Sequence, residues 1–362
     1  MGLEFWRVGQ TSPLTIATDA PVLESQGWDG LVIADSQCVV GDSYVGLAIA
    51  ARETSTLQLG VGVTNPITRH PSVTASAAAG LQAVSGGRMT LGIGRGDSSL
   101  AHIGLAPATP AVFETYLRNV QTYLRGDGVS FGDLDRGSHR RSTELGGAGV
   151  PEDSRLRWLK PDGPKVPVDV AASGPAIIGI AARNAERVTF GVGAGHARLQ
   201  WAIDTARAAR AEAGLDPGTL GLGAYVNVVA HPDEAVALSL AAAGVAMFSR
   251  FSVMHGKVSG PADESTRSNF EKVGERYDLR EHGSGDAKHR DAVDSVHITS
   301  FGIVGTPAQV VDRLVALNGL GLDRVMILGG FAGASEEAAA HLAVSREVLA
   351  REVFPTVREK LG

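Results

Sequence analysis

Cysteine is almost absent from this chain of 362 residues, because Cys38 is the only one. A single thiol excludes an intrachain disulfide, and it also excludes a cluster of thiolates that could hold zinc or an iron–sulfur centre. Proteins without disulfides suit a reducing compartment. We therefore expect a cytoplasmic protein.

Long apolar runs and an excess of positive charge are also missing. The longest apolar run, residues 236–248, is shorter than the roughly 18 to 20 residues of a membrane span. The N-terminus carries Glu4 and Arg7 where a leader would be basic and then apolar. A formal net charge of −6 gives no general attraction to nucleic acid. We expect no membrane or nucleic acid partner, and a small molecule as the substrate.

Short apolar runs alternate with amphipathic stretches along nearly the whole chain. Hydrophobic residues make up 44% of the sequence, which suffices for a large core. Helices are predicted at 110–124, where apolar residues recur every three or four positions, and at 307–319, which follows the cap Thr306. Runs that are apolar on both faces predict parallel strands. They are residues 3–8, 30–34, 57–63, 89–94, 166–171, 187–192, 222–229 and 324–328.

Eight such strands favour a closed α/β barrel, the (β/α)8 TIM barrel, over an open doubly wound sheet. We expect one domain over residues 1–362. Two segments rich in polar residues interrupt the repeat, and we interpret them as insertions: 125–165 after the fourth helix and 249–300 after the seventh. If both enlarge the surroundings of an active site, they leave the same end of the barrel.

Glycine is abundant, with 46 residues, and it gathers where the predicted strands end. A glycine, which has no side chain to cover the backbone, stands at the end of four strands: Gly62, Gly94, Gly174 and Gly193. Each is interpreted either as a tight turn or as a place where a ligand approaches the main chain. A dinucleotide fingerprint is excluded near Gly193, because His196 stands where the third glycine is needed.

Three motifs carry a family resemblance. They are GVGVTNPITRHP from Gly60, SGGRMTLGIGRGD from Ser85 and ASGP from Ala172. Together with the block AQVVDRLVALNGLGLDRVMILGG from Ala308, they closely resemble the bacterial luciferase-like superfamily. Within that superfamily the chain is most similar to the branch that uses the deazaflavin coenzyme F420, typified by methylenetetrahydromethanopterin reductase.

The resemblance implies a barrel, often dimeric, with the cofactor across the C-terminal ends of the strands. It implies a non-prolyl cis peptide at Gly62–Val63, behind the deazaflavin ring, and it places Thr64 and Asn65 at the polar edge of that ring. Gly94 lies at the neighbouring strand end. The cofactor phosphate is expected on Gly174, Pro175, Ala176 and Ile177, with Gly193 and Ala194 on the opposite wall.

The implied activity is that of an F420-dependent oxidoreductase, which transfers a hydride between C5 of the deazaflavin and an organic substrate. Two alternatives stay open: an FMN-dependent monooxygenase, because other branches bind FMN on the same barrel, and a cofactor-binding protein with little catalysis. A homodimer is expected.

Proton transfer is where the chain departs from its relatives. Those that oxidise sugar phosphates carry Asp-His after the second strand, whereas this chain has Asp35-Ser36. Ser36 stands at the histidine position, but an unactivated hydroxyl is no base near neutral pH. Asp97 is the first candidate for the proton, with Asp35 next. The alternative for Asp97 is the cap of a following helix, since Ser98 and Ser99 come directly after it.

Three histidines stand close together in the second polar segment. His282, His289 and His297 are separated by seven and eight residues, which does not give a compact metal site. We interpret them as part of a polar insertion and expect no metal.

Overall fold

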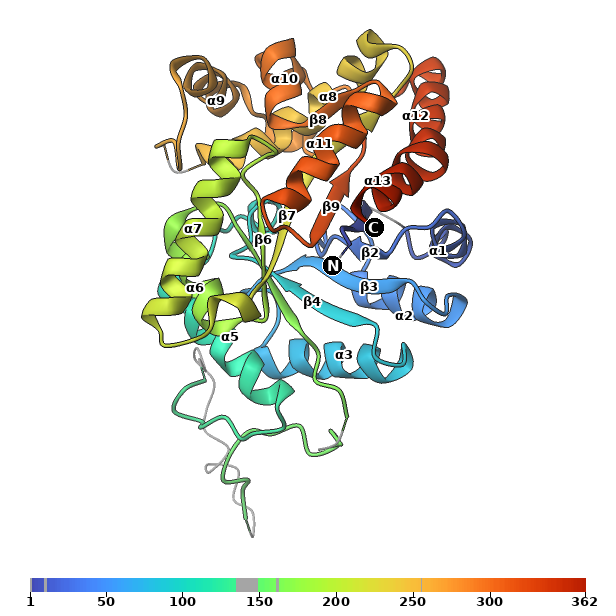
Figure 1. The fold of residues 1–362 in the computed structure, drawn as a ribbon. Coiled ribbons are helices and arrows are strands. Elements are labelled where there is room, and N and C mark those ends of the chain that lie inside the picture. Colours follow the sequence, from blue (N-terminus) through green and yellow to red (C-terminus); the bar gives the residue numbers. More distant parts are fainter. Residues whose placement is uncertain (1, 10–11, 135–148, 161–162, 255) are drawn as a thin grey trace.

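Eight parallel strands form a closed ring at the centre of the computed structural model, which describes residues 2–9, 12–134, 149–160, 163–254 and 256–362. Helices surround the ring, and the two ends of the chain lie close together (Figure 1). In order of pairing, the ring strands are β1 (Glu4–Gly9), β2 (Gly30–Ile33), β3 (Gln58–Thr64), β4 (Met89–Ile93), β5 (Val168–Ala172), β6 (Arg187–Phe190), β7 (Gly221–Ala230) and β9 (Arg324–Leu328). Because β9 pairs with β1, the ring closes as the predicted (β/α)8 barrel.

Each predicted apolar run overlaps one ring strand, and one further strand was not predicted. This is β8 (Ile303–Gly305), which pairs only with the last three residues of β7, Val228–Ala230. Three residues are too few for a period to show in the sequence. The strand forms because β7 is longer than its ring neighbours and its remaining backbone groups need partners.

The two predicted helices are confirmed. α5 covers Pro110–Leu124, and α11 covers Pro307–Gly319 with a capping box between Thr306 and Gln309. The other helices are α1 (Ile16–Ser25), α2 (Ser43–Glu53), α3 (Pro71–Val84), α4 (Ser98–Ala101), α6 (Pro175–Asn184), α7 (His196–Glu212), α8 (Glu234–Ser249), α9 (Glu264–Arg276), α10 (Ser295–Phe301), α12 (Glu336–Val348) and α13 (Phe354–Leu361).

The interior of the barrel is filled differently at its two ends. Near the N-terminal ends of the strands, the guanidinium of Arg324 lies 3.9 Å from the centre of the Trp6 ring and donates to Glu4. Asp169 is buried beside it and accepts from the Thr189 hydroxyl, and burial raises the pKa of this carboxyl. Charged and aromatic groups therefore fill this end, which leaves the opposite end for a cavity.

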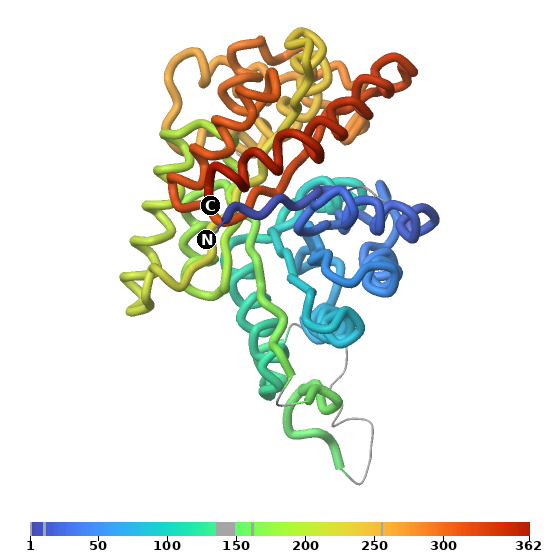
Figure 2. Tube along the Cα trace, turned by 45° about the vertical axis from the view of Figure 1, so that its right-hand side comes forward, coloured from blue at the N-terminus to red at the C-terminus, as the bar shows by residue number. Residues whose placement is uncertain are grey.

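The two expected insertions lie on different sides of the barrel. The described part of residues 125–165 follows α5 and extends away from the strands at one side (Figure 2). Residues 249–300 lie on the other side and contain α9 and most of α10. Residues 135–148 and 161–162 of the first segment lie outside the described residues. That both segments leave the same end of the barrel stays a prediction.

One helix has the length and composition of a membrane span. It runs from Glu234 to Ser252. Its most apolar stretch of 18 residues has a mean hydropathy of 1.5, and 67% of that stretch is buried inside the protein. The helix exceeds the apolar run at 236–248 because it continues into a 3₁₀ turn, Arg250–Ser252. Its apolar residues pack against α10 and the end of β7.

Candidate active site

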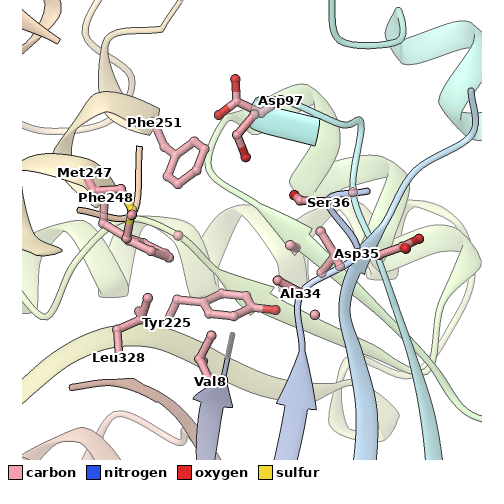
Figure 3. A pocket seen from close by; sticks show the side chains of 18 of the residues that line it. Val8, Ala34, Asp35, Ser36, Asp97, Tyr225, Met247, Phe248, Phe251 and Leu328 are labelled. Atoms are coloured by element: carbon pink, nitrogen blue, oxygen red, sulfur yellow. The ribbon is translucent and has the colours of Figure 1, made fainter. Parts of the chain in front are cut away.

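A cavity of about 1190 Å³ opens where the strands of the barrel end. This volume exceeds that of most pockets for a single small ligand, which hold roughly 300 to 1,000 Å³. Figure 3 shows Val8 and Leu328 on its floor and Ser36 and Asp97 further out. In barrels of this type the strand ends and the loops after them carry the chemistry.

The end of β3 has an irregular backbone. The peptide bond between Gly62 and Val63 is cis, which confirms the prediction, and the register between β3 and β4 shifts at this point. A Cβ at Gly62 would lie 2.8 Å from Val32, and one at Gly92 would lie 2.0 Å from the carbonyl oxygen of Val61. The bulge therefore requires bare backbone on both strands. Gly62 and Val63 line the cavity through it.

Gly94 lies beside the same bulge. It lines the cavity, and a Cβ there would lie 3.0 Å from the side chain of Val63. Because Gly94 has no side chain, β3 can pack closely on β4, and the cavity beside this residue stays open.

The first turn of α6 faces the cavity. Gly174 is its N-cap and supplies no side-chain bond, and the first intrahelical bond comes from Ile178 to the Gly174 carbonyl. The N–H groups of Ala176 and Ile177 precede that bond, so they are free to bind an anion, which the helix dipole also favours. A Cβ at Gly174 would meet only the Ser259 hydroxyl, at 3.8 Å. Pro175 completes this wall.

Thr64 and Asn65 do not line the cavity. Both are fully buried, and the Asn65 side-chain oxygen accepts from the N–H groups of Ile67 and Thr68. Asn65 therefore shapes the loop between β3 and α3. The alternation of side chains along a strand, disturbed by the bulge, turns both residues away from the position expected at the ring edge.

Gly193 and Ala194 are also absent from the cavity lining. Gly193 has a φ of +80°, and a Cβ on it would lie 2.6 Å from the Phe301 ring. The N–H of Ala194 donates to the carbonyl of Phe301 at 2.7 Å. Gly193 therefore provides a turn and a close contact with α10. Of the two interpretations of this glycine, the tight turn is the one that fits.

Asp35 and Ser36 lie side by side at the end of β2 but point differently. The Asp35 carboxylate turns away from the open space (Figure 3), accepts from Gln37 at 2.8 Å and lies 3.9 Å from Arg69. It is only 2% exposed. Ser36 is half-buried and lines the cavity. Both residues therefore belong to the cavity lining, but the Asp35 carboxylate is directed toward Gln37 and Arg69.

Asp97 does not cap α4 with its side chain. It occupies the N-cap position without a side-chain cap bond, and its carboxylate forms an ion pair with Arg250 at the end of α8. Arg250 is 10% exposed at its side chain and Asp97 19%, so the pair is largely shielded from water. Arg250 belongs to no recognisable motif, and nothing local in the sequence links it to β4.

Aromatic side chains that sequence reasoning missed form the remaining walls. Tyr225 lies in β7 among Val8 and Leu328, and Phe248 and Phe251 come from the end of α8 (Figure 3). The rings of Tyr225 and Phe248 are 6.0 Å apart. Burial raises the pKa of the Tyr225 phenol far above its ordinary value. A tyrosine inside an otherwise apolar strand was the available signal.

The three histidines of the second polar segment have separate surroundings. His282 lines the cavity, His289 stacks on Tyr277 with ring centres 4.2 Å apart, and His297 contacts the Ser249 hydroxyl at 2.9 Å. Among the residues that the structure describes, no group of three or more metal-ligating side chains is found.

A family model described as luciferase-like monooxygenase matches residues 10–324. The chain belongs to this family. A curated relative, the 5,10-methylenetetrahydromethanopterin reductase of Methanolobus tindarius, is 27% identical over 355 residues, and the match covers 96% of this chain and 99% of the relative.

Two solved structures share the fold over nearly the whole length. The coenzyme F420-dependent tetrahydromethanopterin reductase from Methanopyrus kandleri has a TM-score of 0.74 and 25% identity, and it covers 98% of this chain and 99% of its own. An F420-dependent secondary alcohol dehydrogenase in complex with an F420–acetone adduct has a TM-score of 0.71 and 17% identity, with coverage of 99% and 100%. The second likeness shows the fold alone.

Proposed function

We propose that this luciferase-like protein is an F420-dependent oxidoreductase acting on an organic substrate. The free N–H groups at the start of α6 carry the proposal, because they suit the phosphate of a phosphorylated cofactor. The name of the Methanopyrus kandleri reductase, a coenzyme F420-dependent enzyme with 25% identity, supports the same cofactor. When bound, the deazaflavin would supply hydride transfer at its C5 atom.

The residues present fit such a group. A Cβ at Gly174 would meet nothing nearer than 3.8 Å, so the space in front of α6 is open. The bulge at Gly62–Val63 supports one side of the cavity, and apolar side chains, Val8 and Leu328 among them, form its floor. These residues could hold the flat ring of the cofactor on an apolar surface and the phosphate of the cofactor at the N-terminus of α6.

Protein side chains would then orient the substrate and exclude water. Phe248 and Phe251 cover the cavity opposite the strand ends, and their rings are 5.2 Å apart at nearly a right angle. The Tyr225 phenol is a polar group near the floor, and the Ser36 hydroxyl lies further out. At neutral pH neither hydroxyl loses its proton, so both act as hydrogen-bonding groups rather than bases.

An FMN-dependent monooxygenase is the second candidate, and the family description itself favours it. FMN also carries a phosphate that the start of α6 could bind. The third alternative, cofactor binding with little catalysis, rests on Ser36 in place of a histidine.

Ligand titration distinguishes these functions. We expect the purified protein to bind oxidised and reduced F420 more tightly than FMN, which fluorescence titration measures. We also expect it to reoxidise reduced F420 when carbonyl compounds, imines or nitroarenes are added. Submicromolar binding of FMN alone would overturn the proposal. Tight F420 binding without turnover of any acceptor would favour the third alternative.

A further inference from the structure

His282 is the only histidine among the described residues that line the cavity, and it comes from the second polar segment rather than from a strand end. It is half-buried. Relatives that oxidise sugar phosphates carry a histidine after the second strand, where this chain has Ser36. The segment between α9 and α10 thus supplies an imidazole to the cavity from the opposite side.

A phenol fixes one nitrogen of this imidazole. The Tyr277 hydroxyl lies 2.5 Å from Nδ1 of His282. Above the Tyr277 ring lies the Arg250 guanidinium, 4.6 Å from the ring centre, and His289 stacks at 4.2 Å. Tyr277 is therefore held by contacts with two neighbouring side chains, which restrict the position of its hydroxyl.

The surroundings decide which partner carries the hydrogen. Burial, together with repulsion from the nearby Arg250, His102 and His289, lowers the pKa of His282 to about 4. The ring is thus neutral near pH 7. A neighbouring cation also makes the phenol a better donor, and Arg250 opposes the rise that burial causes in the pKa of Tyr277. We conclude that Tyr277 donates to Nδ1, which leaves the ring hydrogen on Nε2.

Nε2 of His282 is available to a ligand. In the described part of the chain it has no protein hydrogen-bond partner, and it is not among the buried polar atoms that lack one. The nitrogen is therefore not enclosed by protein, and the residue that carries it lines the cavity. An N–H donor held in one tautomer matches an uncharged oxygen acceptor, and the Asp97–Arg250 ion pair behind it adds no net charge.

We propose that His282 donates a hydrogen bond from Nε2 to the carbonyl oxygen of the substrate, with Tyr277 as the positioning residue. The rings of Phe248 and Phe251 form the adjacent wall, so the body of the substrate is apolar or aromatic. The substrate class is an uncharged, apolar carbonyl compound. This inference rests on the proposed function and names the substrate of the same site.

The tautomer is tested on the protein without cofactor. In ¹⁵N-histidine NMR spectra, the signal that His282→Gln removes should be that of a neutral ring protonated at Nε2, and it should stay so from pH 5.5 to 8. Tyr277→Phe should turn it into a mixture of tautomers. A neutral ring protonated at Nδ1 in the wild-type protein would overturn the proposal.

The contact with substrate is tested with reduced F420 and an aromatic ketone or enone as the probe. His282→Ala should lower kcat/KM at least about tenfold, whereas His282→Gln, which keeps an amide donor, should stay within about threefold. His341→Ala, outside the cavity lining, is the matched control and should behave as wild type. Affinity for F420 should be equal in all variants.

Two results would contradict this inference without contradicting the proposed function. If wild-type protein binds F420 but His282→Ala keeps its kcat/KM, the role of His282 is wrong. If wild-type protein reduces imines or nitroarenes but no carbonyl compound, the substrate class is wrong. Absence of F420 binding by wild-type protein is a third outcome, which overturns the proposed function and the substrate role together.

Discussion

Asp97 and Arg250 join the end of β4 to the end of α8, and their ion pair gives Asp97 a structural role that is an alternative to the predicted proton transfer. In this pair the Asp97 carboxylate is already engaged by a guanidinium rather than left free for a substrate proton. The same contact fixes Arg250 over Tyr277. We therefore interpret Asp97 first as the group that holds this corner of the cavity in place.

Asp97→Asn should lower the free energy of unfolding by about 3 kcal/mol, because it leaves the shielded Arg250 charge without its partner. Urea denaturation checks this. The double variant with Arg250→Gln should recover much of the loss, since the amide pair carries no buried charge.

Single-turnover hydride transfer separates the two roles of Asp97. If the carboxylate relays the proton, Asp97→Asn lowers the rate at least about a hundredfold while unfolding is unchanged, and the double variant restores nothing. That pattern would contradict the ion-pair interpretation.

The first turn of α6 allows a separate prediction about cofactor binding to be tested by mutation. Gly174→Val places two methyl groups in front of the free N–H groups of Ala176 and Ile177, where the nearest protein atom to a new Cβ is 3.8 Å away. Affinity for F420 should fall at least about tenfold, and affinity for an analogue without the phosphate should change little. Isothermal titration with both ligands measures the difference.

The backbone of Gly174 has φ −119° and ψ 156°, which valine adopts easily, so the variant should fold as wild type. Thermal unfolding of the cofactor-free variant provides the control. An equal loss of affinity for both ligands would point to a general change in the loop rather than to a phosphate site.

Acid should destabilise the whole molecule through its buried histidines. Burial lowers the pKa of His282 and of His297 to about 4, and it also lowers the pKa of His289. The unfolded chain, with histidine pKa values near 6.5, thus binds more protons between pH 6.5 and 4. The stabilisation is complete above pH 6.5 and is lost as the pH falls toward 4.

Chemical denaturation at a series of pH values measures this loss. His297→Gln should flatten the dependence on pH, because it removes one of the titrating groups while an amide can still contact Ser249. A free energy of unfolding that stays constant from pH 6.5 to 4.5 would contradict the prediction.

The sequence by itself determined the barrel, because strands buried on both faces need unbroken apolar runs and the helices between them need a period near 3.6. Local glycine motifs likewise indicated the family, the bulge at Gly62–Val63 and the start of α6. These features depend on residues close together in the chain, so a single sequence records them.

Only the tertiary structure decided which polar groups reach the cavity. Asp35 and Ser36 are neighbours in the chain, yet only the serine side chain faces the open space. Arg250 and His282 belong to a polar segment without a period, and folding brings them to the strand ends. The direction of a side chain and the partner of a charge depend on contacts between residues far apart in the chain, which no local pattern encodes.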